Sequence, residues 1–322
     1  MNRWGLVLAL LGLVVGVWLI AMQDLDALAG LFATAGLGLL LLLPAHLPFM
    51  MANAWAWAML MPRHQRPDAL AMMELIWIRE SINTLLPVGR VGGELACYRL
   101  MRRQGVGSGA AAGGLLMDMG LSVLSQMAFA LLGLALLLAS GQEVGLAVIL
   151  GVTLGGIVLA APFIAIQNAR VFGRVSAWLH RITAGKITGL AEESRRIDAF
   201  LRRAWRLPKL LLWCFAWQLF ANILGALQIW LALWLVGMPI TFLEAVIIEA
   251  LVQAVVAFGF AVPGGLGVLE AGFIGVGALM GLDATTSVAL ALMRRFREVA
   301  MYLPGLAAWA WVERRPPVAR PA

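Results

Sequence analysis

The sequence has few charged residues, few cysteines and few tyrosines. Only 13% of its 322 residues are charged, whereas an average soluble domain has about 25%. The two cysteines, Cys97 and Cys214, lie in or beside apolar segments and lack the spacing of metal ligands. This arrangement excludes a disulfide framework, and we expect both cysteines to be packing residues.

Signatures of metal and nucleotide chemistry are also missing. The three histidines, His46, His64 and His180, are scattered and form no H-E-x-x-H or other zinc motif. No P-loop, G-x-S-x-G motif or dinucleotide fingerprint follows a predicted strand. The sequence therefore predicts neither a metal site nor a bound cofactor.

Apolar residues dominate the chain. They make up 62% of it, and several runs exceed the length of about 18 residues that indicates a membrane helix. Thirteen tryptophans also suit a membrane protein, because Trp favours the bilayer interface. We predict an all-α polytopic membrane protein with a single membrane domain over residues 1–322. About six full spans are expected, near 5–22, 36–60, 109–138, 145–166, 210–236 and 285–311.

The first apolar run, residues 5–22, also resembles a secretory signal peptide. No small-x-small cleavage site follows it, and the next segments are apolar as well. We therefore interpret it as the first span.

The segment 167–209 is strongly basic. It has ten Lys or Arg residues against three acidic ones, an excess equal to the net charge of +7 of the whole chain. Because Lys and Arg accumulate in cytoplasmic loops, we predict a bacterial inner-membrane protein whose N-terminus, basic loop and C-terminus are cytoplasmic. The loop either only fixes this topology or lies on the anionic inner leaflet. Nucleic acid is not an expected partner.

Residues 69–104 carry too many polar side chains for a simple span. Basic residues flank both ends, so both ends should be cytoplasmic and the segment should be a re-entrant hairpin. A proline would end its first helix, and glycines would allow a tight turn. These expected turn residues are Pro87, Gly89, Gly92 and Gly93.

A second glycine-rich segment repeats this pattern 176 residues later. Pro87 and Glu94 correspond to Pro263 and Glu270, and the same offset relates Gly105 to Gly281. We predict an inverted repeat with unit one at 36–138 and unit two at 210–312, although two unrelated glycine-rich loops would also give the pattern. The turn residues expected in the second hairpin are Pro263, Gly264, Gly265 and Gly267.

Asp118 and Arg294 are equivalent positions under this offset and carry opposite charges. Each lies about nine residues, or roughly 14 Å, into its span, near the middle of the apolar core. We predict that Asp118 meets Arg294 or a close neighbour. Alternatively, each pairs separately with Glu94, Glu270 or Glu298.

The many charges in the broken segments should line an interior polar cavity, since facing lipid would be costly. Arginines there could hold an anionic headgroup, while glutamates neutralise them or hold an amine. An ion network that only stabilises the fold is the alternative. The expected cavity residues are Arg79, Glu80, Asn83, Arg90, Glu94, Asp118, Glu249, Glu270, Arg294 and Arg297, with Glu244 and Arg295 in the same group.

Three motifs resemble the flippase-like membrane family, which includes the membrane half of bifunctional lysylphosphatidylglycerol synthases. They are N-x-L-L-P-x-G-x-x-G-G-E at 83–94, P-G-G-x-G-x-x-E at 263–270, and an Arg-rich span ending Y-L-P-G at 302–305. The stretch W-I-R-E-S-I-N at 77–83 is most similar to the bacterial subgroup associated with hopanoid biosynthesis. The resemblance implies movement or export of a polar lipid. We expect no soluble aminoacyl-transferase domain, because the chain ends at Ala322.

The leading hypothesis is therefore a lipid translocase or lipid-transport component. Its partners would be membrane lipids with an anionic headgroup, or hopanoids, and possible lipid-biosynthesis enzymes. A membrane transferase with Glu94 or Glu270 as general base is one alternative. A non-catalytic scaffold for lipid enzymes is the other.

Overall fold

The fold is helical throughout the part of the chain that the computed structural model describes: residues 14, 17–19, 21–86, 92–141, 145–167, 190–259, 262 and 265–314. No strand occurs within these segments. Several predictions lie outside them and stay predictions. These are most of the first span, the greater part of the basic loop, and the residues Pro87, Gly89, Arg90, Pro263 and Gly264.

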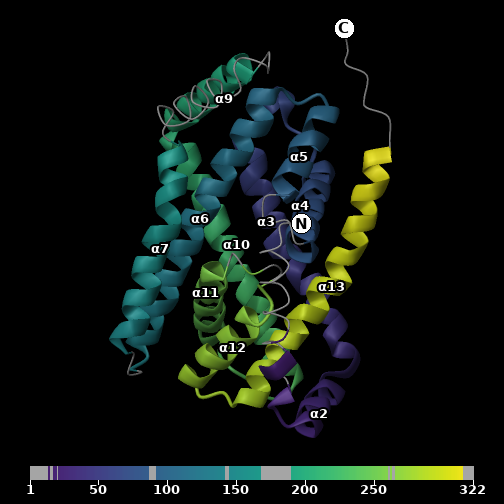
Figure 1. The fold of residues 1–322 in the computed structure, drawn as a ribbon, viewed down its shortest axis with the longest axis vertical. Coiled ribbons are helices and arrows are strands. Elements are labelled where there is room, and N and C mark those ends of the chain that lie inside the picture. The colour runs from purple at the N-terminus through teal and green to yellow at the C-terminus, as the bar shows by residue number, and fades with distance from the viewer. Residues whose placement is uncertain are drawn as a thin grey trace.

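Long helices occupy the apolar segments (Figure 1). Among the residues that the structure describes, three stretches are long and apolar enough to cross a membrane: Leu25–Leu60, Ser108–Ala139 and Pro208–Leu235. Helices occupy the segments predicted as spans at 109–138, 145–166, 210–236 and 285–311, with ends that agree to within a few residues. The long helices and the elements that extend them are α2 (Leu25–Ala35), η1 (Gly36–Leu41), α3 (Leu42–Leu60), α6 (Ser108–Ala139), α7 (Leu146–Gln167), α10 (Pro208–Leu235) and α13 (Ala284–Arg314).

The second predicted span begins earlier than expected. Asp24 accepts hydrogen bonds from the backbone N–H groups of Asp26 and Ala27, both at 3.0 Å, and so caps α2. The chain then tightens into the 3₁₀ turn η1 before α3. Asp24 and Asp26, which follow the first predicted span, therefore mark the start of a helix.

Two pairs of shorter helices occupy the two segments that contain the glycine-rich motifs. The first pair is α4 (Ala69–Leu85) with α5 (Gly92–Arg103), and the second is α11 (Phe242–Phe258) with α12 (Val268–Leu279). Helices α5 and α12 have 12 residues each. At 1.5 Å per residue this is about 18 Å, which is shorter than the ~30 Å apolar core of a bilayer.

In each hairpin, the chain before the first helix lies close to the chain after the second helix. Gln65 Oε1, before α4, accepts a hydrogen bond from the N–H of Gly107, after α5, at 3.1 Å. Around the second hairpin, Thr286 Oγ1 lies 3.3 Å from Met238 Sδ. In Figure 1 the first hairpin lies toward the end of the bundle that carries α9 (Leu190–Trp205), and the second lies at the other end, near α2.

The turn glycines differ between the hairpins. Gly265 and Gly267 have φ angles of 58° and 75°, a region that favours glycine, and α12 begins directly after them. Gly92 and Gly93 were expected in a turn, but they form the first residues of α5. Gly93 is needed for close packing instead, since a Cβ there would lie 2.5 Å from the carbonyl oxygen of Arg79 on α4.

Small residues let the long helices approach these hairpins. A Cβ on Gly133 of α6 would overlap Ala250 of α11, and a Cβ on Gly305 of α13 would overlap Ser81 of α4. Close approach at glycine is typical of helices packed within membranes, where dispersion contacts hold helices together. This packing fixes α4 against α13 and α11 against α6.

Candidate functional site: two polar clusters and a pocket

The first polar cluster joins α4, α6 and α10. Arg79 Nη1 donates to Asp118 Oδ2 at 2.6 Å, and Gln218 Nε2 donates to Asp118 Oδ1 at 2.8 Å. Arg79 and Asp118 are only 8% and 2% exposed. The guanidinium also lies 5.2 Å from the centre of the Trp57 ring, a cation–π contact. This is a buried ion pair whose charges compensate each other.

Beside this pair, Asn83 closes the first hairpin. Its Oδ1 accepts from the N–H of Gly93 at 2.9 Å, and its Nδ2 donates to both carboxylate oxygens of Glu94 at 3.2 Å. Glu80 Oε1 lies 3.5 Å from Arg79 Nε. Asn83 therefore links the end of α4 to the start of α5 through backbone and side chain.

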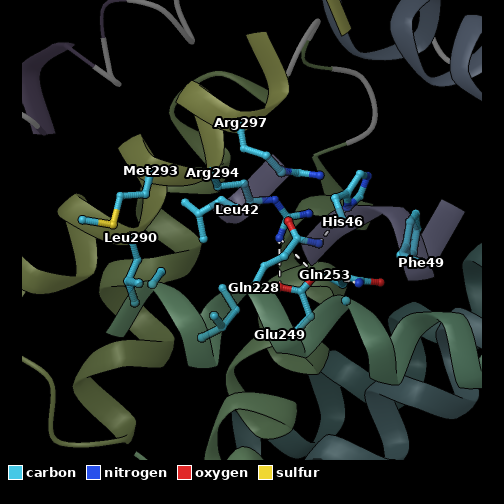
Figure 2. Close-up of a pocket in the computed structure, with 13 residues that line it drawn as sticks. Leu42, His46, Phe49, Gln228, Glu249, Gln253, Leu290, Met293, Arg294 and Arg297 are labelled. Carbon is cyan, nitrogen blue, oxygen red and sulfur yellow. Dashed lines mark hydrogen bonds and ion pairs between the residues drawn. The ribbon is translucent and has the colours of Figure 1, made fainter. Parts of the chain in front are cut away.

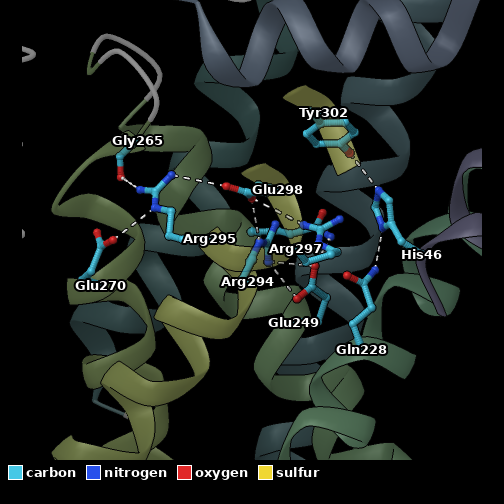
Figure 3. Close-up of polar contacts among 11 residues, drawn as sticks. His46, Gln228, Glu249, Gly265, Glu270, Arg294, Arg295, Arg297, Glu298 and Tyr302 are labelled. Carbon is cyan, nitrogen blue, oxygen red and sulfur yellow. Dashed lines mark hydrogen bonds and ion pairs between the residues drawn. The ribbon is translucent and has the colours of Figure 1, made fainter. Parts of the chain in front are cut away.

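The second polar cluster joins α11, α12 and α13 (Figure 3). Arg294 Nη1 donates to both oxygens of Glu249, at 3.0 and 3.1 Å. Glu298 accepts from Arg294 and Arg295 at 3.4 Å and from Arg297 at 3.5 Å. Glu298 is thus shared by three guanidinium groups.

Arg295 connects this cluster to the second hairpin. It donates to Glu270 Oε1 at 3.2 Å and to the carbonyl oxygen of Gly265 at 2.9 Å. Both acceptors lie at the start of α12. Arg295 therefore holds the hairpin turn against the middle of α13.

A pocket of about 60 Å³ lies next to the second cluster, between α3, α10, α11 and α13 (Figure 2). Apolar residues such as Leu42, Leu290 and Met293 form part of its wall. The polar side chains on the wall are His46, Gln228, Glu249, Gln253, Arg294 and Arg297.

Arg297 is the least satisfied of these side chains. It is 4% exposed, yet neither Nε nor Nη1 has a hydrogen-bond partner among the described residues. Its remaining nitrogen reaches Glu298 at 3.5 Å, and its guanidinium carbon lies 5.9 Å from the centre of the Tyr302 ring. Buried charged donors without partners are costly, so a group absent from the protein itself is expected to satisfy them.

His46 connects three helices at the edge of the pocket. Its Nε2 lies 2.8 Å from Tyr302 Oη on α13, and its Nδ1 lies 2.7 Å from Gln228 Nε2 on α10. The ring also stacks on Phe49, with the ring centres 4.9 Å apart. With the Gln228 amide as donor, Nδ1 is the acceptor and Nε2 carries the proton.

The predicted pair between Asp118 and Arg294 is wrong. Asp118 pairs with Arg79, and Arg294 pairs with Glu249 and Glu298. The alternative of separate pairs is correct for Arg294 with Glu298, but it did not include Arg79 as the partner of Asp118. Each charged residue finds its partner within its own half of the chain, where helix packing places it closer.

The structure distributes the predicted cavity residues over two polar clusters. The first cluster contains Arg79, Glu80, Asn83, Glu94 and Asp118, and the second contains Glu249, Glu270, Arg294 and Arg297. The pocket does not lie between the two hairpins, because α4, α5 and α12 contribute nothing to its wall. Glu244 is not on the wall of this pocket, and it forms a capping box with Thr241 at the start of α11.

Several polar residues of the site were not predicted from the sequence. They are His46, Gln218, Gln228, Gln253 and Tyr302, which are uncharged or weakly polar residues within or beside apolar runs. A signal was present on α10, where Gln218, Asn222 and Gly225 recur at the spacing of one helix face. A stripe of polar and small residues within an apolar span indicates a helix face that packs against other helices of the protein.

The geometry fits a membrane protein that holds polar groups in its interior. Within the described residues, no group of three or more His, Cys, Asp or Glu side chains is placed to hold a metal ion. A protein family described as the lysylphosphatidylglycerol synthase TM region matches residues 6–305. The chain belongs to this family. Comparison of the chain with curated proteins and with solved structures gives no match.

Proposed function

We propose that this protein moves a polar lipid between the leaflets of the bacterial inner membrane. The pocket beside Glu249, Arg294 and Arg297 is the observation that carries the proposal. Charged side chains inside a membrane domain are expensive, and they commonly mark substrate pathways. Family membership supports a role in lipid modification or transport. The headgroup would occupy the pocket while the acyl chains stay in the bilayer.

An inverted repeat of two re-entrant hairpins would give this pocket access from both sides. Three pairs of positions separated by 176 residues support it. Helices α5 and α12 begin at 92 and 268, and α6 and α13 begin at 108 and 284. Gly105 and Gly281, just before those long helices, have similar positive φ angles of 89° and 78°. Transporters of several folds place a binding site between such units.

The buried ion pairs also support the repeat. In the first unit α4 contributes the arginine and α6 the carboxylate, as Arg79 and Asp118. In the second unit α11 contributes the carboxylate and α13 the arginine, as Glu249 and Arg294. An ion pair therefore joins α4 to α6 in the first unit and α11 to α13 in the second, with the charges exchanged between units. In the second unit, Arg295 and Glu270 add a further ion pair between α13 and α12.

The orientation follows from the charge distribution. With six spans and both hairpins re-entrant, the N-terminus, the basic loop 167–209 and the C-terminus face the cytoplasm. Exposed arginines on α5 (Arg99) and in the last turn of α9 (Arg202 and Arg203) agree with this orientation. The cargo would be a lipid with an anionic headgroup or a hopanoid, received from or passed to lipid-biosynthesis enzymes.

A liposome assay tests the proposal. The purified full chain is reconstituted with a trace of phospholipid labelled on one acyl chain with nitrobenzoxadiazole, and dithionite then reduces the label in the outer leaflet. We expect the inner-leaflet label to become accessible faster than in protein-free liposomes. Equal rates with and without protein would contradict lipid movement, and a modified lipid detected by mass spectrometry would indicate a transferase.

A pocket-narrowing variant makes the assay specific. A Cβ on Gly225 would lie 3.6 Å from Glu249 Oε1 and 3.7 Å from Phe49, which is ordinary contact distance. Gly225→Ala should therefore fold while it reduces the space in the pocket and slows lipid movement. Gly151→Ala on α7 is the matched control, because nothing lies within 4 Å of its added Cβ. Equal slowing by both variants would dissociate the pocket from transport.

A further inference from the structure

The charges around the pocket are unequally satisfied. Arg294 holds both oxygens of Glu249, and Arg295 holds Glu270 and a backbone carbonyl. Arg297 shares only Glu298, at 3.5 Å, the longest of the three contacts that this carboxylate makes. The positive charge of Arg297 is therefore the least compensated in the second cluster.

The pocket next to Arg297 has a size suited to a small oxyanion. Its volume is about 60 Å³. A cavity that holds a single water needs only roughly 10–15 Å³, so this pocket has room for a group larger than one water, such as a phosphate.

Neutral donors complete the pocket wall. Gln228 and Gln253 each use one amide N–H, toward His46 and Glu249, and each has a second N–H available. Charged and neutral N–H groups together form the usual recognition set for phosphate oxygens.

We propose that Arg297 is the anchor of an oxyanion site that binds a phosphate group in this pocket. For the identity of the cargo, this inference rests on the proposed function: the transported lipid carries a phosphate headgroup, rather than an amine or an uncharged hopanoid. Arg297 receives the phosphate through Nε and Nη1, and Glu298 keeps the guanidinium oriented. Arg294 and Arg295 are retained by their carboxylates and act on structure.

Binding can be measured on the purified full chain in detergent. Cys97 and Cys214 are buried and unpaired, so a thiol-reactive fluorophore reports thermal unfolding. Inorganic phosphate and glycerol 3-phosphate are the probes, and sodium chloride of equal ionic strength is the reference. We expect both probes, but not chloride, to raise the melting temperature in a saturable manner.

Variants locate the site. Arg297→Gln should weaken phosphate binding about 10- to 100-fold, in the range of a lost charged hydrogen bond. Arg297→Lys keeps the charge and should bind with an intermediate affinity. Arg206→Gln removes one positive charge from an exposed residue directly after α9, away from the pocket wall, and this variant should bind phosphate like wild type. If Arg297→Gln does not fold, the Lys variant and the wild-type titration still decide the matter.

Three outcomes overturn the inference. Wild-type protein that responds equally to phosphate and chloride has a pocket filled by water only. If Arg297→Lys and Arg297→Gln both bind phosphate with the wild-type affinity, the phosphate site lies elsewhere in the protein. Liposomes in which the protein moves a cationic lipid faster than phosphatidylglycerol would show a transporter with another cargo.

The source of the phosphate and the function are tested separately. If phosphatidylglycerol movement is inhibited by Arg297→Gln, the phosphate belongs to a lipid. If free phosphate binds at Arg297 but no lipid moves in liposomes, the oxyanion site stands and the proposed lipid transport fails.

Discussion

Single buried side chains determine the stability of this bundle. Asp118 compensates Arg79 in an interior where neither can reach water, so removal of one partner leaves an isolated charge. Removing one partner of such a pair costs about 3–5 kcal/mol, whereas removing both together costs much less.

We therefore expect Asp118→Ala to lower the melting temperature strongly, and Arg79→Met in addition to restore part of it. The measurement is thermal unfolding followed by reactivity of Cys97 and Cys214. Arg99→Ala is the control, since its side chain is 64% exposed in its pair with Glu313 and should contribute less than about 1 kcal/mol. Additive losses in the double variant would contradict a direct pair.

Gly305 allows α13 to touch α4. An added Cβ would overlap Ser81 Oγ and lie 3.1 Å from Trp77 Nε1, which donates to the carbonyl oxygen of Met301 at 2.7 Å. Gly305→Ala should destabilise the protein by about 1–3 kcal/mol through overpacking. Gly275→Ala on α12, with nothing within 4 Å, should not. Similar melting temperatures for the two variants would refute this contact.

The residues of the site were predictable by type, but their pairing was not. Charge in an apolar run marks Arg79, Asp118, Glu249 and Arg294 as interior groups. Their partners depend on how two helices rotate and cross relative to each other. The spacing of residues along one helix does not give this information. His46 was missed because one imidazole in an apolar run carries no periodic signal.

Some helix boundaries were predictable because proline acts locally, whereas the starts of α2 at Leu25 and of α5 at Gly92 were not predicted. Helix α4 ends at Leu85, two residues before Pro87, since the residue before a proline disfavours the helical conformation. The role of Gly93 was not predictable in the same way, because it depends on the carbonyl oxygen of Arg79 across the hairpin.

Asp283 caps α13 and gives the helix a pH dependence. It accepts from the N–H and Oγ1 of Thr286 at 3.0 and 2.6 Å, and these hydrogen bonds hold the pKa of the Asp283 carboxyl below its usual value. A depressed pKa contributes stability above the unfolded value of about 3.9, and this stability is lost as pH falls through the folded pKa.

We expect Asp283→Ala to cost about 1 kcal/mol at neutral pH. The difference in melting temperature from wild type should be constant above about pH 5 and should shrink below about pH 4. Asp283→Asn keeps the acceptor and should show little pH dependence of its own. A difference that grows on acidification would contradict the capping role.

The arrangement of the entire bundle follows from the two hairpins at its opposite ends. With single cysteines introduced in a Cys97→Ala, Cys214→Ala background, an impermeant maleimide should label Gly145→Cys and Ala284→Cys in spheroplasts. Gln104→Cys and Arg203→Cys, at the other end of the bundle, should react only after permeabilisation. Labelling of Gln104→Cys and Ala284→Cys from the same side would exclude the inverted repeat.

The most direct measurement of headgroup entry is photocrosslinking in native membranes. Leu290 lines the pocket and is 2% exposed, Leu251 is equally buried but away from it, and Leu212 is 67% exposed on the outside of α10. A diazirine-bearing residue at position 290 should give phospholipid adducts at the headgroup or glycerol. The same residue at position 212 should give adducts at the acyl chains, and at position 251 it should give only adducts within the protein. Acyl-chain adducts alone at 290, or no lipid adduct there, would contradict a pocket that receives lipid headgroups.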